Sequence, residues 1–233
     1  MAKRTPDRQK APVADAVVVL SGGQDSALCL ALACREYGAE KVAAITFGYG
    51  QRHSLETKYA RALCRRFGVK RHKVVNLGFY PHITGNALMD PRGKIEKRKG
   101  ASAPTTLVEG RNAIFLMLAG VWAKGLGARK IYTGVSEADF SGYPDCREEF
   151  IRSQCETMRL AMEWPFEIVT PFMHMTKAAE WELADSMGLM ETIRTRTLTC
   201  YRGIPGDGCG KCPSCRLRNR GLREYLKKKG KKK

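Results

Sequence analysis

The chain has 233 residues, 43% of them hydrophobic, and a formal net charge of +18. This length can bury the core of one α/β domain with an appended region. No run of about 18 apolar residues occurs, so the sequence predicts no membrane span. Residues 1–12 are basic and polar and lack the apolar core of a secretory signal. Nine cysteines without such a signal indicate a reducing, cytoplasmic location, where thiols bind metals or stay free.

Much of the positive charge lies at the two ends. Six of the last seven residues are lysines, and residues 3–10 are also basic. We expect residues 1–13 to be a disordered leader and residues 227–233 a disordered lysine tail. Such a tail can hold RNA or another polyanion loosely or serve only as a solubilising end, and we do not expect nucleic-acid contact to be essential.

Between the ends, apolar runs alternate with helical patterns. The predicted strands span 16–20, 41–47, 72–75, 130–133 and 167–169, and the predicted helices span 25–37, 55–67, 112–125, 146–162 and 176–186. This rhythm predicts a doubly wound, mostly parallel five-stranded sheet with helices on both faces. Such sheets bind ligands at the carboxyl ends of their strands.

Two regions interrupt the rhythm. Residues 78–111 carry three prolines and a charged cluster, which predicts a long loop or flap. Residues 191–226 hold the last four cysteines of the chain. We therefore expect an α/β domain over residues 14–190 and a metal-binding region over residues 191–226.

The loop at residues 21–26 reads Ser-Gly-Gly-Gln-Asp-Ser, between the first predicted strand and helix. A helix N-terminus with nearby glycines binds anions, because its first N–H groups have no intrahelical partner. Ser21 and Ser26 can add hydroxyl donors, and Asp25 can hold a magnesium ion. The loop lacks the Gly-Lys-Ser/Thr of the usual P-loop and the G-x-G-x-x-G of dinucleotide sites. An ordinary glycine turn is the alternative.

The last four cysteines follow the pattern C-x8-C-x2-C-x2-C, with glycines between them. Four thiolates on tight turns suit one tetrahedral, structural zinc ion; an iron–sulfur cluster uses the same ligands but is disfavoured by this spacing. Nearby basic residues would offset the negative charge of the centre. The predicted metal ligands are Cys200, Cys209, Cys212 and Cys215; the basic neighbours are Arg202, Lys211, Arg216 and Arg218; Cys29, Cys34, Cys64 and Cys155 are predicted core thiols, and Cys146 is left open.

The glycine loop resembles that of the PP-loop ATP pyrophosphatases. Over about residues 14–226 the chain resembles one family of them, the 7-cyano-7-deazaguanine synthases of queuosine precursor biosynthesis. The matching text is F-G-Y-G-Q-R-H at 47–53, G-R-N at 110–112, T-G-V-S-E-A-D-F-S-G-Y-P-D-C-R at 133–147 and T-L-T-C-Y-R-G-I-P-G-D-G-C-G-K-C-P-S-C at 197–215. Glu109 stands where proline is expected in the family, which affects the local loop more than the chemistry.

The resemblance implies an adenine nucleotide alpha hydrolase-like fold and a ligase. This enzyme would convert 7-carboxy-7-deazaguanine and ammonia to 7-cyano-7-deazaguanine through adenylated carboxylate and amide intermediates. It would use ATP, Mg²⁺ and one structural Zn²⁺, and the family tends to form homodimers. By the resemblance, the ATP segment is Leu20, Ser21, Gly22, Gly23, Gln24, Asp25, Ser26, Ala27, Leu28, Cys29 and Leu30, and the catalytic residues are Asp25, Ser26, Lys177 and Arg111.

The base is expected to be read by a carboxylate, which can accept from two ring-edge N–H donors at once. The candidates lie on the loop after the fourth strand, although helix capping is an alternative, most of all for Asp145. Further candidates are arginine, histidine and aromatic side chains. The predicted substrate residues are Arg52, His53, Glu137, Asp139, Tyr143 and Asp145, with Tyr49 and Phe140 as further stacking candidates.

Two other functions fit the same residues. A PP-loop enzyme that modifies tRNA directly is favoured by the basic ends, although no separate RNA-binding domain is visible. A non-enzymatic zinc-knuckle protein that binds nucleic acid is disfavoured by the intact glycine loop and Asp25.

Overall fold

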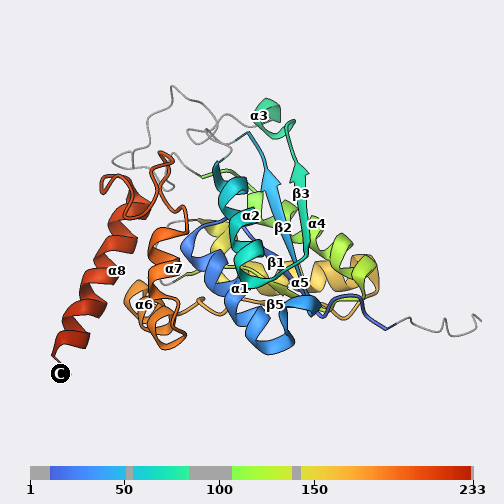
Figure 1. Cartoon of the computed structure of the whole chain (residues 1–233). Helices are drawn as coiled ribbons and strands as arrows, with labels where there is room; N and C mark the ends of the chain where they lie inside the picture. The colour runs from blue at the N-terminus through green and yellow to red at the C-terminus, as the bar shows by residue number, and fades with distance from the viewer. Residues whose placement is uncertain (1–10, 51–54, 84–106, 138–142, 232–233) are drawn as a thin grey trace, which may run out of the picture.

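The computed structural model describes residues 11–50, 55–83, 107–137 and 143–231. At its centre lies a five-stranded sheet in the order β3-β2-β1-β4-β5, in which all strands run parallel (Figure 1). The strands are β1 (Ala16–Val19), β2 (Val42–Gly48), β3 (Arg71–Asn76), β4 (Lys130–Tyr132) and β5 (Glu167–Val169). The predicted doubly wound sheet is confirmed, with shifts of one residue at some strand ends.

The central strands β1 and β2 bury both of their faces, because side chains alternate across a sheet that is covered on both sides. On β1, Val17 packs with Phe115 and Met158 against helices α4 (Arg111–Leu126) and α5 (Glu148–Met162). Its neighbours Ala16 and Val18 pack against the opposite layer, which contains α1 (Gln24–Tyr37), α2 (Leu55–Phe67) and α6 (Lys177–Ser186). The near-continuous apolar run of β1 is therefore explained by its central place in the sheet.

The five predicted helices are present, and the structure adds shorter elements. A 3₁₀ turn at Ala39–Lys41 precedes β2, and α3 (Tyr80–Ile83) lies within the predicted flap, most of which falls outside the described residues. The helix predicted from residue 146 begins at Glu148. Pro144–Cys146 instead form a 3₁₀ turn, and Arg147 has an extended backbone.

Two helices in the C-terminal region were missed by sequence reasoning, α7 (Met190–Thr195) and α8 (Pro213–Gly230). Pro213 suits the first turn of α8, because its missing N–H has no partner there. The helix buries Cys215, Leu222 and Tyr225 on one face. The prediction of disorder is wrong for residues 227–230, which form the last turn of α8.

The helices α6, α7 and α8 lie together on one side of the molecule (Figure 1). The contact between α6 and α8 is close at Gly221, where an added Cβ would lie 2.5 Å from the Cβ of Lys177. Among the described residues, none of the helices has the length and apolar character needed to cross a membrane.

Candidate functional site

The glycine loop joins the end of β1 to the start of α1, as the sequence predicted. The hydroxyls of Ser21 and Ser26 lie 3.0 Å apart, and the Ser26 hydroxyl donates to the carbonyl of Gly23 at 3.1 Å. Gly22 has a φ of +87°, and a Cβ there would lie 2.8 Å from the Glu56 carbonyl oxygen. This turn therefore requires glycine, and it presents two hydroxyls beside the positive end of α1.

Lys177 reaches this loop from the first residue of α6. Its helix is capped by Thr176, whose hydroxyl accepts from the backbone N–H of Ala179 at 3.3 Å. The Lys177 ammonium lies 2.8 Å from a carboxylate oxygen of Asp25, although its side chain is only 7% exposed. The structure therefore brings together two residues that the sequence placed in the site from positions far apart in the chain.

Glu180 completes this cluster and was missed by sequence reasoning. It is fully buried, and it accepts hydrogen bonds from Lys177 Nζ at 2.7 Å and from Gln24 Nε2 at 3.2 Å. Burial raises the pKa of the Glu180 carboxyl to about 9, and the negative charge of Asp25 acts in the same direction against the opposing effect of Lys177. The sequence did offer one indication of this pair, because residues three positions apart on a helix, such as Lys177 and Glu180, lie side by side.

Replacing Glu180 with glutamine should make folding stability less dependent on pH. Because the folded-state pKa of Glu180 is raised, its contribution to stability is full below the pKa of the unfolded chain, about 4.3. That contribution is lost as the pH rises towards the folded-state pKa. Urea unfolding at pH 5.5 and pH 8 should therefore show a smaller difference in unfolding free energy for Glu180→Gln, by at least about 1 kcal/mol. Equal differences for both proteins would contradict this assignment.

A second cluster surrounds Arg111, the first residue of α4. Its guanidinium donates to the hydroxyl of Tyr49 at 3.3 Å and lies 5.8 Å from the centre of that ring. Although burial opposes the charge, Tyr49, Asp145, Tyr143 and Tyr201 together raise the pKa of Arg111 above its ordinary value. Three of these four neighbours were sequence candidates; Tyr201 was missed.

Two of the candidate base-reading carboxylates accept hydrogen bonds from the first turns of helices. Asp145 accepts from the backbone N–H of Asn112 at 2.9 Å, and Glu137 accepts from that of Glu148 at 3.1 Å. Asp145 thus stabilises the N-terminus of α4, and Glu137 stabilises that of α5. Helix capping was the alternative role expected for these carboxylates, and here each carboxylate caps a helix that is not adjacent to it in sequence. The candidates Arg52, His53, Asp139 and Phe140 lie outside the described residues.

The loop that carries Glu109 is well formed without the expected proline. Gly110 has a φ of +67° and precedes α4. The carbonyl of Glu109 accepts from the Tyr80 hydroxyl at 2.8 Å, and the N–H of Arg111 donates to the carbonyl of Val108 at 3.2 Å. This turn places Arg111 at the start of the helix.

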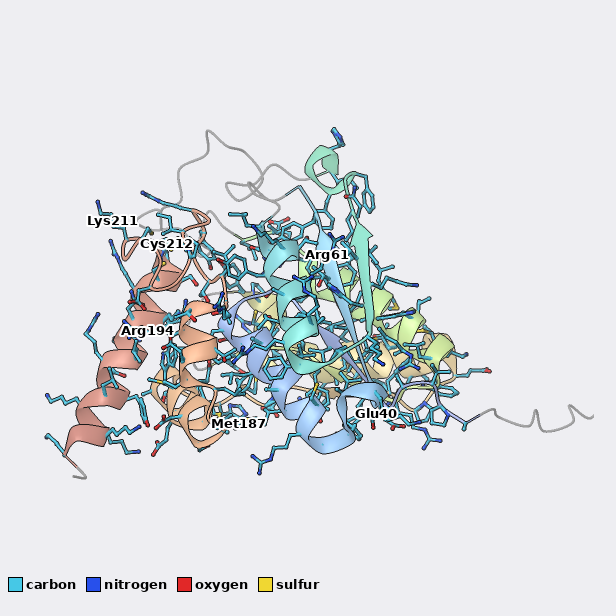
Figure 2. All side chains as sticks on the ribbon, in the orientation of Figure 1. Glu40, Arg61, Met187, Arg194, Lys211 and Cys212 are labelled. Carbon is cyan, nitrogen blue, oxygen red and sulfur yellow. The ribbon has the colours of Figure 1, made fainter. Side chains whose placement is uncertain are left out.

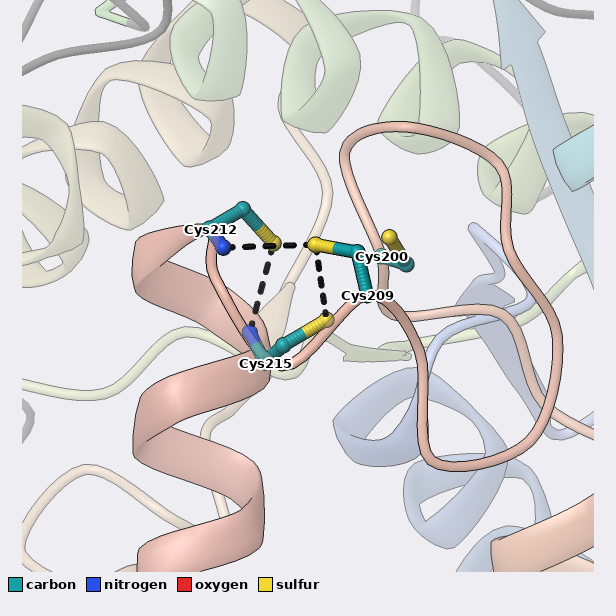
Figure 3. A group of neighbouring side chains, drawn as sticks. All are labelled: Cys200, Cys209, Cys212 and Cys215. Atoms are coloured by element: carbon teal, nitrogen blue, oxygen red, sulfur yellow. Dashed lines mark hydrogen bonds between the residues drawn. The ribbon is translucent and has the colours of Figure 1, made fainter.

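The four C-terminal cysteines converge as predicted (Figure 3). Their sulfur atoms all lie within 4.8 Å of one another, and those of Cys209 and Cys215 are 4.0 Å apart. Tetrahedral zinc with bonds of about 2.3 Å separates its sulfurs by about 3.8 Å, so the four thiols fit that ion. Gly208 has a φ of +73°, and a Cβ there would lie 2.3 Å from the sulfur of Cys215.

Backbone N–H groups point at these sulfurs. Cys209 Sγ accepts from the N–H groups of Cys212 at 3.3 Å and Lys211 at 3.4 Å, and Cys212 Sγ accepts from Cys215 at 3.4 Å. Although its burial acts in the opposite direction, these bonds to Cys209 lower the pKa of its thiol to about 6. The thiolate form that metals bind is therefore favoured at Cys209.

Among the basic neighbours, Arg218 also joins separate segments of the chain. It is buried, and its guanidinium donates to the carbonyls of Gly206 at 2.7 Å and Ile193 at 2.8 Å. It therefore joins α8 to α7 and to the loop of the cysteines. Lys211 is exposed and lies beside Cys212 at the N-terminal end of α8 (Figure 2).

The other cysteines lie among core side chains or at their edge. Cys29 and Cys64 are buried, and Cys34 and Cys155 are half-buried. Cys146 is also half-buried, and its sulfur accepts from the side-chain amide of Asn112 at 3.4 Å.

A protein-family model, "Queuosine biosynthesis protein QueC", matches residues 15–226. The chain belongs to the QueC family. The glycine loop, Arg111, Lys177 and all four clustered cysteines lie within the QueC match.

Solved structures similar to this QueC-family chain include an NH3-dependent NAD synthetase from Campylobacter jejuni, at 18% identity and a TM-score of 0.47, covering 80% of this chain and 69% of that one. An NMN synthetase from Francisella tularensis has 15% identity and a TM-score of 0.47, with coverages of 78% and 65%. A 4-thiouridine synthetase in complex with RNA and ATP has 19% identity and a TM-score of 0.48, with coverages of 92% and 50%.

Proposed function

We propose that the chain is an ATP-dependent ligase that converts 7-carboxy-7-deazaguanine and ammonia to 7-cyano-7-deazaguanine. The observation that carries the proposal is the contact between Asp25 and Lys177 at the glycine loop, in a chain of the QueC family. A carboxylate and an ammonium beside a helix N-terminus suit the magnesium ion and the phosphates of a nucleotide.

The proposed reaction uses two nucleotides. The substrate carboxylate first displaces pyrophosphate from ATP to form an acyl adenylate, and ammonia displaces AMP to give the amide. The amide oxygen then displaces pyrophosphate from a second ATP as the nitrogen loses one proton, and loss of AMP and of the second N–H proton leaves the nitrile. Each adenylation converts a poor leaving oxygen into a good one, so the protein acts mainly by positioning and by stabilising charge.

At the nucleotide end, the loop from Ser21 to Ser26 would hold the phosphates through its hydroxyls and the start of α1. Asp25 would bind the magnesium ion, which draws negative charge from the phosphate oxygens when bound. Lys177 would neutralise the departing pyrophosphate. Its ammonium lies beside the carboxylates of Asp25 and Glu180, which hold it at the glycine loop.

At the substrate end, Arg111 would hold the carboxylate. A guanidinium carries five N–H donors in a fork that fits a carboxylate, and the half-buried Tyr143 would stack on the deazaguanine. The base would be read by a carboxylate on the loop after β4. We favour Asp139, because Glu137 and Asp145 each accept from a helix N-terminus.

The test is an assay of the zinc-loaded protein with 7-carboxy-7-deazaguanine, ammonium and Mg-ATP. Mass spectrometry should show the nitrile and two AMP for each base converted. A single AMP with the amide as end product would contradict the second activation, and no turnover would overturn the proposal. We also propose a cytoplasmic homodimer, for which sedimentation of the purified protein should give twice the chain mass.

The alternative is a PP-loop enzyme that acts directly on RNA. It is favoured by the exposed lysines at positions 227–229 on the last turn of α8. A parallel assay with tRNA in place of the free base distinguishes the two. AMP release with tRNA alone, together with salt-sensitive binding, would favour the alternative.

A further inference from the structure

The segment before the first metal ligand crosses the glycine loop. The backbone N–H of Leu198 donates to the carbonyl of Gly22 at 2.8 Å. One residue earlier, the buried Thr197 donates its hydroxyl to the carbonyl of Ile193 at 2.6 Å, which attaches the segment to α7. The segment at residues 197–198 therefore connects the glycine loop to α7.

Thr199 makes a second bond to this loop. Its hydroxyl accepts from the backbone N–H of Gln24 at 3.3 Å, across 175 positions of sequence. Gln24 is the first residue of α1, and the N-cap residue Gly23 has no side chain that could cap the helix. Thr199 thus supplies the cap that the loop's own sequence lacks.

A capping hydroxyl is compatible with a bound phosphate. A threonine hydroxyl has one donor and two acceptor sites. While its oxygen accepts from Gln24, its proton can be donated to an anion held at the same helix end. Thr199 can therefore hold the loop in place and contact the phosphate at the same time.

The residue after Thr199 is Cys200, one of the four clustered cysteines. A metal ion that fixes Cys200 also fixes its neighbour, because adjacent Cα atoms are about 3.8 Å apart. The same ion would fix Cys212 and Cys215 at the start of α8, and Gly221 of that helix packs against Lys177. The glycine loop thus contacts the segment next to Cys200 directly, and it is connected to α8 through Lys177.

We propose that Thr199 is a positioning residue that links metal binding to nucleotide binding, so that each ligand strengthens the binding of the other. This link rests on the proposed function, since it concerns the affinity of the glycine loop for ATP. The coupling must be reciprocal, because linkage between two binding equilibria has the same size in both directions.

The experiment measures Mg-ATP binding by calorimetry on the full chain, without the base or ammonia. The wild-type protein is compared with Thr199→Val, which removes the hydroxyl at nearly constant shape, and with Thr199→Ser, which keeps it. With zinc bound, Thr199→Val should bind Mg-ATP about five-fold more weakly, and Thr199→Ser should bind within about two-fold of wild type.

The measurement in the opposite direction follows the rate of zinc release to a chelating dye, for which the sign of the ATP effect is predicted and not its size. Saturating Mg-ATP should slow the loss of zinc from the wild-type protein and should slow it less in Thr199→Val. This measurement starts from the folded, zinc-loaded protein, so it does not depend on the stability of a metal-free form. Circular dichroism of each zinc-loaded variant checks that the fold is kept.

The outcomes separate the two proposals. Equal Mg-ATP affinities for wild type and Thr199→Val, with zinc release indifferent to ATP, would overturn the link and leave the proposed function intact. Weakening by Thr199→Ser equal to that by Thr199→Val would also overturn the role of the hydroxyl. A zinc-loaded wild-type protein that fails to bind Mg-ATP would overturn the proposed function and the link with it.

Discussion

Replacing Asp25 with asparagine should lower AMP and nitrile formation together by at least about 10³-fold, because a metal ligand in such a site supplies several kcal/mol of charge stabilisation. The substitution keeps the size of the side chain and removes its charge. The fold should persist, since Lys177 keeps its bond to Glu180. Loss of the negative charge of Asp25 should also lower the pKa of Glu180, because that charge is one of the causes that raise it.

The measurement is the coupled assay of AMP and base mass, with urea unfolding of the same samples. Asp207→Asn is the matched control: Asp207 forms an exposed ion pair with Arg194 at 2.8 Å, and such pairs contribute about 0–1 kcal/mol. The control should retain its activity. An Asp25→Asn protein with AMP release near that of wild type would place the magnesium ion elsewhere.

Replacing Cys215 with serine should abolish the predicted binding of zinc and destabilise the C-terminal region by several kcal/mol. Structural zinc contributes about 10–16 kcal/mol of apparent binding free energy in small zinc domains, and a site with three thiolates loses much of it. Cys215 is 1% exposed, so the serine hydroxyl that replaces its thiol would be shielded from solvent. Zinc content measured by mass spectrometry should fall from one ion per chain to a small fraction, and thermal unfolding should shift to lower temperature.

Cys155→Ser is the matched control for this substitution. Cys155 is half-buried on α5, and its thiol donates to the carbonyl of Phe166 at 3.4 Å, a bond that a serine hydroxyl can also make. This variant should keep its zinc. Full zinc content in Cys215→Ser would show that the ion is held by other residues.

The sheet, the glycine loop and the group of four cysteines could be predicted from the sequence, because each is marked by a local sequence pattern. Apolar runs mark the strands, six consecutive residues mark the glycine loop, and three of the four metal ligands lie within seven positions. The helix α8 was missed because its buried face includes Arg218, whose guanidinium donates to carbonyl groups of distant segments and lies over the ring of Trp181.

The residues that complete the site could not be predicted, because their partners are distant in the sequence. Glu180 meets Gln24 across 156 positions, and Thr199 meets the same residue across 175. Asp145 caps a helix that begins more than thirty residues before it. Local sequence patterns carry no information on such long-range pairs. The pairs are formed only in the folded chain, so they were identified from the structure.

The bond between Thr199 and Gln24 also sets an order of events during synthesis of the chain. A ribosome that adds about 5–20 residues per second needs roughly 10–35 s to make the 175 positions between them. Until Thr199 has been synthesised, the glycine loop lacks the residue that caps α1. A chain that stops before residue 199 therefore carries the loop but leaves it incomplete, so interrupted synthesis products should be unable to compete with the finished protein for nucleotide.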